Sequence, residues 1–516
     1  MPDGGRRGAP RWIENDPAVS ESPEPTPSSP LPGAASREPT PRGTPDPTPS
    51  RERLGPLDAP AVHVHVRRLG DRFQRLLNSN TRRLWLQVGL PWSAALLVGL
   101  MSVLYARWST ECYELFRHWI HGRAWLAFLI TPGMMVLAVY ATRHWFYGSE
   151  GSGIPQVIAA IHAPREEGEE TLMRRLFGVR VIVGKILVSL VAFLGGMTIG
   201  REGPTVHIGA AIMAETRRFY PRRTLQLERR LLIAGAAAGL SGAFNTPIAG
   251  VVFAIEELAR DFETRTNGTM ITAIIFSGLT SLALAGNYLY FGQLNVTGHI
   301  GIEFALPVIV VAVGCGLMGA AFSYGLLHWR RWMPARLREF RLGKPLWYAL
   351  ASGLVIAAIG VATRGQTWGS GYEQARELLH GTAPLSMAFG MSKWVAMLVS
   401  YLAGIPGGLF SPALAIGAGI AQWVHALFSW APMAVLIALC MTAYLAAITQ
   451  SPITSFVIVM EMTNGTAMVI PMMAVALAAS RIAALIAEPV YHGLARDRYF
   501  RYRPPPESGL AAPAEP

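Results

Sequence analysis

The stretch Gly200-Arg201-Glu202-Gly203-Pro204 places an acidic residue in a break between two apolar segments. Proline is favoured in the first turn of a helix, because its missing N–H would be unpaired there, and glycine lets the backbone approach a ligand closely. The free N–H groups at a helix start have partial positive charge and bind anions. The stretch therefore predicts a helix that begins within an apolar region and presents its N-terminus to an anion.

Two further stretches share the Gly-x-x-x-Pro pattern, namely Gly151-Ser152-Gly153-Ile154-Pro155 and Gly408-Leu409-Phe410-Ser411-Pro412. The bare pattern is not specific in a chain this rich in glycine and proline. Its weight comes from context, because each stretch interrupts or precedes an apolar segment. Stretch 200–204 also lacks the Gly-Lys-Ser/Thr ending of a nucleotide-binding loop. We therefore interpret the three stretches as helix starts around one shared anion site.

An internal repeat relates the two halves of the chain. Residues 238–256 resemble residues 443–461 at a spacing of 205 residues, which pairs Glu256 with Glu461. Stretches 200–204 and 408–412 correspond at a spacing of 208 residues. Related halves in a membrane protein indicate parallel or inverted repeats, and the residues alone leave that choice open.

The composition is typical of a membrane protein. Of the 516 residues, 51% are hydrophobic and 15% are charged, whereas an ordinary soluble domain has about 25% charged residues. A straight span needs about 20 apolar residues, and shorter segments are expected where helices break to form a binding site. The expected spans or part-spans lie near residues 84–106, 124–142, 180–199, 205–215, 230–257, 270–291, 305–328, 346–363, 386–403, 411–429, 431–449, 453–463 and 467–487.

The formal net charge of +12 raises the question of nucleic-acid binding. Arginine pairs such as Arg174-Arg175 and Arg330-Arg331 lie beside apolar runs, as is typical of cytoplasmic loops of membrane proteins. We therefore expect the chain to contact the lipid bilayer and to bind no nucleic acid.

The sequence has no pattern typical of a metal or cofactor site. Cys112, Cys315 and Cys440 are far apart and lack metal-ligand spacing. No His-Glu-x-x-His motif is present. We therefore expect no metal and no cofactor, and a transporter rather than an intramembrane enzyme, which is the alternative from another functional class.

The composition also divides the chain into four predicted parts. Residues 1–78 are rich in proline and polar residues and are predicted to form a disordered tail. Residues 79–291 and 292–495 are predicted to form the first and the second transmembrane repeat. Residues 496–516 are predicted to form a short C-terminal tail.

Glu202 is the most informative residue of the three stretches. An ionised carboxylate at an anion-binding helix end would occupy the anion site itself, and on protonation it would leave, so that it would be both a gate and a proton carrier. The alternative is a charge at the membrane surface, or one paired with Arg201. Acidic residues inside a membrane are costly and usually functional, which favours the gate.

Two adjacent acids, Glu256 and Glu257, end a long apolar segment. Successive helical residues point about 100° apart, so these acids cannot face the same way. One could accept protons from the cytoplasm while the other is in a salt bridge, with Lys185 as a candidate partner. The alternative is that both cap the helix at an interface. Glu461 has no adjacent acid, and we expect it to be structural and hydrogen-bonded near a helix end.

Together these residues resemble the CLC family of chloride channels and chloride/proton exchangers over about residues 80 to 495. The resemblance is in stretches 151–155, 200–204 and 408–412, and in Phe244-Asn245-Thr246-Pro247 leading to Glu256-Glu257. It implies an all-α polytopic membrane protein with two inverted-topology repeats of tilted and broken helices. It also implies a homodimer with one pore per subunit.

The resemblance further assigns roles to individual residues. Glu202 corresponds to the gating glutamate, Glu257 to the internal proton-transfer glutamate of exchangers, and Lys185 to a buried base associated with it. The anion-binding residues that it implies are the hydroxyls of Ser152 and Tyr491, the backbone N–H groups of Leu409 and Phe410, and the backbone of Gly153, Ile154, Arg201, Glu202 and Gly203.

Two departures within the family narrow the expected function. Ser152 rather than proline resembles members that prefer chloride over nitrate, and stretch 200–204 argues against the fluoride-exporting branch. The chain ends soon after Tyr491, so paired CBS domains are not expected. We therefore expect chloride/proton antiport, with a passive voltage- or pH-gated chloride channel as the alternative. The location we expect is a bacterial inner membrane, with both termini cytoplasmic.

Overall fold

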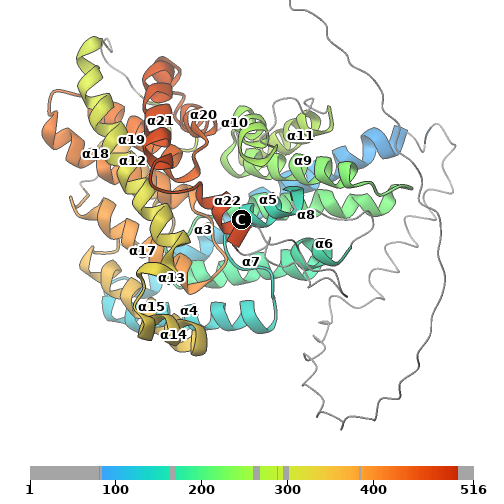
Figure 1. Ribbon diagram of the computed structural model, residues 1–516, viewed down its shortest axis with the longest axis horizontal. Coiled ribbons are helices and arrows are strands. Elements are labelled where there is room, and N and C mark those ends of the chain that lie inside the picture. The colour runs from blue at the N-terminus through green and yellow to red at the C-terminus, as the bar shows by residue number, and fades with distance from the viewer. Residues whose placement is uncertain are drawn as a thin grey trace, which may run out of the picture. The chain divides into compact units, whose positions relative to one another are not determined.

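The computed structural model describes residues 81, 84–162, 170–259, 268–286, 289–294, 301–382 and 385–497 (Figure 1). The predicted N-terminal tail, residues 1–78, lies outside the described residues, as does most of the predicted C-terminal tail, residues 496–516. The described residues belong to one compact unit, Leu54–Pro516.

The described part of the chain is helical and contains no strand beyond two isolated backbone bridges. The first-half helices are α3 (Leu90–Ile120), α4 (Ala127–His144), α5 (Ile154–His162), α6 (Glu170–Phe177), α7 (Val179–Leu194), α8 (Glu202–Glu215), α9 (Leu225–Phe244), α10 (Pro247–Phe253), which continues into the π-helical turn η5 (Ala254–Ala259), and α11 (Gly268–Ala285). The second-half helices are α12 (Ala305–Leu327), α13 (Trp329–Trp332), α14 (Ala335–Gly343), α15 (Pro345–Ala362), α16 (Tyr372–His380), α17 (Phe389–Ala403), α18 (Phe410–Leu427), α19 (Met433–Thr449), α20 (Pro452–Thr463), α21 (Val469–Ala484) and α22 (Val490–Ala495).

Within the described residues, eight helical segments are long and apolar enough to cross a membrane. They are Trp85–Ile120, Ala124–His144, Met173–Leu194, Gly268–Ala285, Ile302–Leu327, Pro345–Ala362, Phe410–Leu427 and Thr466–Ala484. Shorter apolar helices, among them α19 and α20, lie between them. The chain is thus a multi-pass membrane protein with broken helices, as predicted.

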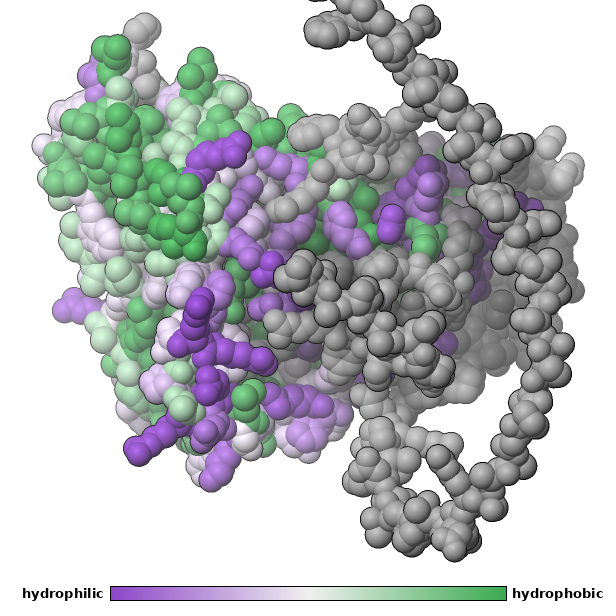
Figure 2. Space-filling view, in the orientation of Figure 1, coloured by the Kyte–Doolittle hydropathy of each residue, from purple (hydrophilic) through white to green (hydrophobic). Residues whose placement is uncertain are grey.

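The surface separates into apolar and polar regions, as expected for a protein in a bilayer. Figure 2 shows a broad hydrophobic surface at the upper left, in the region of α12 and α21. Large apolar side chains on these helices are exposed, including Ile309, Leu317 and Ile470. Hydrophilic surface gathers at the lower centre, over α13 and α14, whose sequences contain several arginines.

The two halves repeat one packing order. In the first half α8 packs against α9, α9 against α11, and α11 against α3. In the second half α18 packs against α19, α19 against α21, and α21 against α12. The two halves contact each other through α4 with α15 and through α10 with α20, and the latter pair lies side by side in Figure 1.

Reciprocal hydrogen bonds between α10 and α20 show that the halves are inverted. The Glu256 carboxylate, at the end of the first-half helix, accepts from the backbone N–H groups of Ile453 (3.0 Å) and Thr454 (2.6 Å) at the start of α20. The Glu461 carboxylate, at the end of α20, accepts from Ile248 (3.0 Å) and Ala249 (2.7 Å) at the start of α10. Each helix end therefore lies beside the start of its counterpart, so the pair is antiparallel. This decides the choice that the residues alone left open.

One expected segment is divided in the structure. Residues 230–257 read as a single apolar segment, but α9 ends at Phe244 and α10 begins at Pro247. Asn245 between them adopts the left-handed conformation, with φ of 57°. Asparagine tolerates this conformation better than most residues, and the proline two positions later starts a new helix. The break is what places the start of α10 beside Glu461.

Candidate anion site

Segment 405–408, which leads into stretch 408–412, is hydrogen-bonded through its backbone to both of the other stretches. Gly200 and Gly408 exchange two N–H···O bonds, of 2.8 Å and 2.7 Å. The segment just before Gly408 pairs with Gly151, through Gly151 N–H to Ile405 O and Gly407 N–H to Gly151 O, both 3.2 Å. Helices α5, α8 and α18 therefore all begin at one place, as the shared pattern predicts.

The starts of α8 and α18 leave their first-turn N–H groups without an intrahelical acceptor. The residues that precede them, Arg201 and Leu409, do not cap these helices with their side chains. Gly203 in the first turn of α8 is required for the close approach of the stretches. A Cβ at this position would collide with Ser152 Oγ and lie 3.1 Å from Gly408 Cα. The site is thus lined with backbone, with helix dipoles directed toward it.

Two buried hydroxyls beside these helix starts face each other. Ser152 and Tyr491 are both 0% exposed, and apart from each other their hydroxyls have no hydrogen-bond partner among the described residues. Ser152 is held by its backbone N–H, which donates to Tyr401 OH at 2.9 Å, and the Tyr491 ring stacks on Phe410 with 5.8 Å between ring centres. Two neighbouring hydroxyls beside helix starts with free N–H groups fit a ligand that accepts hydrogen bonds.

The Glu202 carboxylate is fully buried at the start of α8. Its Oε1 atom accepts hydrogen bonds from Ser411 Oγ at 2.5 Å and from Tyr290 OH at 3.2 Å. The burial rules out the alternative of a surface charge. The Arg201 Nε atom lies 4.0 Å from Oε1, and a terminal nitrogen of the same guanidinium donates to Ala106 O at 3.0 Å. Arg201 is therefore only a distant ion-pair partner of Glu202.

Sequence reasoning missed both hydroxyl donors to Glu202. Ser411 lies within stretch 408–412, but the pattern gives its side chain no role. Tyr290 lies after α11, near the end of the predicted first repeat, and nothing in the local sequence marks it. Only the fold brings the two hydroxyls to the carboxylate.

The Glu257 carboxylate is also buried, at 1% exposure, in the π-helical turn η5. It accepts a hydrogen bond from Ser451 Oγ. His492 Nε2 lies 3.7 Å from its Oε1 atom, and the His492 side chain is 18% exposed. Glu256 points instead to the start of α20, so the two adjacent acids face different ways, as predicted. His492 directly follows Tyr491, and its place beside Glu257 was not foreseen.

Lys185 is buried and binds the backbone at the beginning of stretch 151–155. Its ammonium group donates to Glu150 O at 3.2 Å and to Gly151 O at 3.0 Å. Its association with Glu257 stays a prediction. Lys393, 208 residues later, makes the same kind of contact, donating to Thr367 O at 2.9 Å and to Gly369 O at 2.7 Å.

The second lysine contact belongs to an unrecognised part of the repeat. Gly369-Ser370-Gly371 repeats Gly151-Ser152-Gly153, and each precedes a helix of nine residues, α16 or α5. This part of the repeat could have been predicted from the sequence, because Gly-Ser-Gly and a lysine within an apolar segment occur in each half. Each half thus uses one buried lysine to hold the carbonyl groups that lead into a Gly-Ser-Gly turn.

Aromatic rings form a connected cluster beside Glu202. The Phe410 ring packs edge-on against Phe244 and Phe253, with 6.2 Å between ring centres in each pair, and it stacks on Tyr491. Tyr290, which bonds Glu202, packs edge-on against Phe244 with 5.2 Å between ring centres. Tyr491 lies within electrostatic range of both Glu202 and Glu257. The cluster therefore runs from Tyr290, at Glu202, to Tyr491, near both acids.

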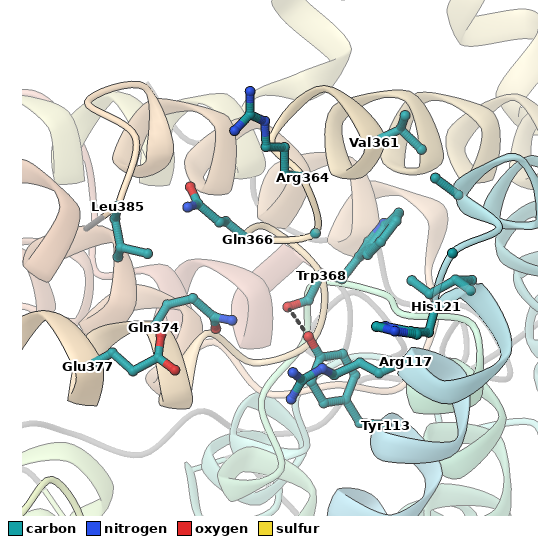
Figure 3. A pocket seen from close by; sticks show the side chains of 14 residues that line it. Tyr113, Arg117, His121, Val361, Arg364, Gln366, Trp368, Gln374, Glu377 and Leu385 are labelled. Carbon is teal, nitrogen blue, oxygen red and sulfur yellow. Dashed lines mark hydrogen bonds between the residues drawn. The ribbon is translucent and has the colours of Figure 1, made fainter. Parts of the chain in front are cut away.

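Two other features lie outside this arrangement. His207 is buried, its Nε2 atom contacts Leu176 O at 2.8 Å, and its ring packs edge-on against Phe177, which fits a packing role. A cavity of about 510 Å³ lies between α3, α15 and α16 (Figure 3). Its wall includes Arg117, Arg364 and Trp368, and Tyr113 OH donates to Trp368 O at 3.2 Å. None of the predicted anion-site residues lines it.

Comparison with known proteins identifies similar sequences and folds. The model of a family described as "Voltage gated chloride channel" matches residues 134–484. The voltage-gated ClC-type chloride channel ClcB of Salmonella typhi is 31% identical over 314 residues, which are 59% of this chain and 73% of that protein. The H(+)/Cl(-) exchange transporter ClcA of Salmonella paratyphi A is 28% identical over 385 residues, covering 71% of this chain and 77% of that protein.

Solved structures share the fold at lower sequence identity. A slow cyanobacterial Cl-/H+ antiporter superposes with a TM-score of 0.67 at 24% identity, covering 80% of this chain and 99% of that one. A CLC-type fluoride/proton antiporter has the same TM-score at 20% identity, with 81% of this chain and 99% of that one covered. The fold of two inverted repeats of broken helices therefore has close structural counterparts.

Proposed function

Because this chain belongs to the voltage-gated chloride channel (CLC) family, we propose that it moves chloride across the membrane in exchange for protons. One observation is central to the proposal. The buried hydroxyls of Ser152 and Tyr491, which have no partner but each other among the described residues, lie beside the starts of α8 and α18. Hydroxyl and backbone N–H donors suit a halide, and partial charges hold it weakly enough to be released.

Chloride is bound in two adjoining places in this proposal. In the central place it accepts from Ser152, Tyr491 and the N–H groups of Leu409 and Phe410, with the backbone of Gly153 and Ile154 nearby. In the outer place it meets the backbone of Arg201, Glu202 and Gly203. The Phe410 ring, stacked on Tyr491, narrows the path at the central place.

Glu202 is the gate and the proton carrier. Its carboxylate is 0% exposed beside the starts of α8 and α18, so in the ionised form it competes with chloride for this region. When the carboxylate takes up a proton, it becomes neutral and is no longer attracted to the helix starts. The side chain then leaves the anion site, and chloride enters. One group thereby links the two ions, because the proton must arrive before chloride can move.

Glu257 receives protons from the other side. It is buried beside Ser451 and His492, which are not among the residues that bind chloride in this proposal. Protons and chloride therefore share the region of Glu202 and take separate routes beyond it. His492 is partly exposed, so it can pass protons between water and Glu257.

A passive chloride channel is the second candidate. The relative ClcB, 31% identical over the matched residues, is named a channel. The same central place for chloride would serve both functions. The buried Glu257 with its hydroxyl and imidazole neighbours favours exchange, because a passive channel has no need for an internal proton acceptor.

Other parts of the proposal follow from family membership alone. The protein is a homodimer with one anion path in each subunit. It resides in a bacterial inner membrane with both termini cytoplasmic, and it uses no cofactor. The boundaries of the repeats, residues 79–291 and 292–495, stay predictions, and so do the tails.

Purified protein in liposomes tests the proposal directly. A proton gradient without a chloride gradient should drive chloride uphill, and both fluxes should be recorded in the same vesicles. Uphill chloride movement supports exchange. Chloride flux that only dissipates its own gradient supports the channel, and no chloride flux contradicts both. Protein-free liposomes are the control.

A further inference from the structure

The two oxygens of the Glu202 carboxylate have different surroundings. Oε1 accepts from Ser411 Oγ at 2.5 Å and from Tyr290 OH at 3.2 Å. Oε2 is buried and has no hydrogen-bond partner among the residues that the structure describes. Donors to a carboxylate stabilise its ionised form, so the hold on Glu202 acts through one atom only.

The donors come from parts of the chain far from Glu202. Ser411 lies in the first turn of α18, in the opposite repeat. Tyr290 lies after α11, near the end of the predicted first repeat, and is 2% exposed. Its ring packs against Tyr372 at 4.5 Å and Phe244 at 5.2 Å, so its hydroxyl is held in place from outside the site.

The two hydroxyls also contact each other, with 3.2 Å between Tyr290 OH and Ser411 Oγ. If the carboxyl group leaves, one hydroxyl can donate to the other. Its departure therefore does not leave two buried hydroxyls without partners, which would be costly. The pair can serve both a bound and a released Glu202.

We propose that Ser411 and Tyr290 form a hydroxyl latch that holds ionised Glu202 by Oε1, and that Oε2 is the atom that takes up the proton. Protonation of Oε2 breaks no hydrogen bond. Oε1 already accepts two hydroxyl hydrogens, so a proton on Oε1 would crowd against them and displace one of the two hydrogen bonds. The carboxylate gains one proton and becomes neutral, and no other bond changes. Its hydrogen bonds to the latch are then no longer charge-assisted and weaken, so the side chain leaves. This inference rests on the proposed role of Glu202 as gate.

The other ionisable groups around Glu202 do not replace the latch. Arg201 lies 4.0 Å from Oε1 on the same turn, with its guanidinium 5.7 Å from the Tyr290 ring centre. Tyr105 on α3 and Tyr491 on α22 are also within electrostatic range of Glu202. Only Ser411 and Tyr290 donate a hydrogen bond to the carboxylate among the described residues.

The test measures chloride and proton flux against pH in liposomes with full-length protein. Ser411→Ala removes the shorter hydrogen bond, so Glu202 should take up a proton about ten-fold more readily. The pH profile of chloride flux should then move by about one unit to higher pH. The number of chloride ions transported per proton should rise, because Glu202 spends less time bound in the position that blocks chloride. Tyr290→Phe should act in the same direction with a smaller shift, and Ser411→Thr should restore the wild-type profile.

Matched controls remove hydroxyls that have no role in the latch. Ser323 on α12 and Tyr444 on α19 are fully buried, and their hydroxyls have no partner among the described residues. Ser323→Ala and Tyr444→Phe should leave the profile unchanged. If Ser411→Ala does not fold, as judged by size-exclusion chromatography in detergent, Tyr290→Phe decides.

Two outcomes separate the latch from the proposed function. Wild-type pH profiles and flux ratios in both Ser411→Ala and Tyr290→Phe would overturn the latch while leaving the gate intact. Proton coupling that persists in Glu202→Gln would overturn the gate itself, and the latch with it.

Discussion

Two pairs of equivalent helices use acidic residues in different ways. In η5, which continues α10, and near the end of α20, Glu256 and Glu461 occupy matching positions, and each caps the start of the opposite helix. At the starts of α8 and α18, Glu202 stands in the first half where Phe410 stands in the second, 208 residues later. The first pair keeps an acid in both halves and fills both helix starts permanently. The second pair has one acid at its helix starts, Glu202, which protonation can displace.

The same contrast separates the two adjacent acids. Glu256 has a counterpart in Glu461, whereas Glu257 corresponds to Met462 at the same spacing of 205 residues. Lys185 and Lys393 likewise hold carbonyl groups in both halves. We infer that Glu256 and Glu461, which match each other, maintain the scaffold, whereas Glu202 and Glu257, which have no acidic counterpart, carry the chemistry.

The largest expected effect comes from Glu202, the acid at the start of α8 that has no acidic counterpart in the second half. Glu202→Gln removes the group that both blocks the anion path and takes up the proton. We expect proton transport to fall by about 100-fold or more while chloride flux persists. Simultaneous flux recordings in liposomes measure both. Proton coupling that survives in Glu202→Gln or Glu202→Ala would show that Glu202 does not carry the proton.

The next effect in size concerns Glu257. Glu257→Gln should lower proton transport by about ten-fold, because one proton-transfer step loses its acceptor, and chloride should still pass. The matched control is Glu256→Gln, one residue earlier, which should keep the wild-type flux ratio. If Glu257→Gln also stops chloride, the residue has a folding role and the inference fails for it.

A smaller effect is expected at the anion itself. Tyr491→Phe removes one of the two neighbouring hydroxyls of the central site. One hydrogen bond contributes about 1 kcal/mol, so chloride affinity should fall several-fold. Isothermal titration of chloride into purified protein measures the change, with Tyr444→Phe as the control. Unchanged affinity would mean that the Tyr491 hydroxyl does not face the anion.

The smallest functional effect is expected from the symmetric acids. Glu461→Gln keeps one acceptor oxygen but loses the charge that strengthens its bonds to Ile248 and Ala249. We expect a loss of about 1–2 kcal/mol of stability, seen as a lower unfolding temperature in detergent. The chloride-to-proton ratio should not change. A changed ratio would show that symmetry does not mark structural residues here.

Much of the fold could be predicted because its signals are local. The three Gly-x-x-x-Pro stretches begin helices as expected, and Pro345 and Pro452 each start one of the predicted apolar segments. The spacing of 205 residues between Glu256 and Glu461 correctly indicated two related halves. The break at Asn245 was missed, because apolar content continues across it and the left-handed residue has no strong pattern of its own.

The candidate site was only partly predictable for a different reason. Glu202, Ser152 and Phe410 stand inside recognisable stretches. Ser411 and Tyr290 act on Glu202 through side chains whose local sequence has no feature that sets them apart. His492 beside Glu257 and Lys393 opposite Lys185 are likewise defined by their neighbours in space.

The sequence by itself determined most of the helix starts, how much of the chain is apolar, and which acids interrupt apolar segments. These properties depend on residues within a few positions of one another, through backbone preferences and hydrophobicity. Only the tertiary structure decided that the halves are inverted, which helix start each acid faces, and which oxygen of Glu202 is bonded. Those contacts join residues about 90 to 210 positions apart, and they form only when the antiparallel helices dock.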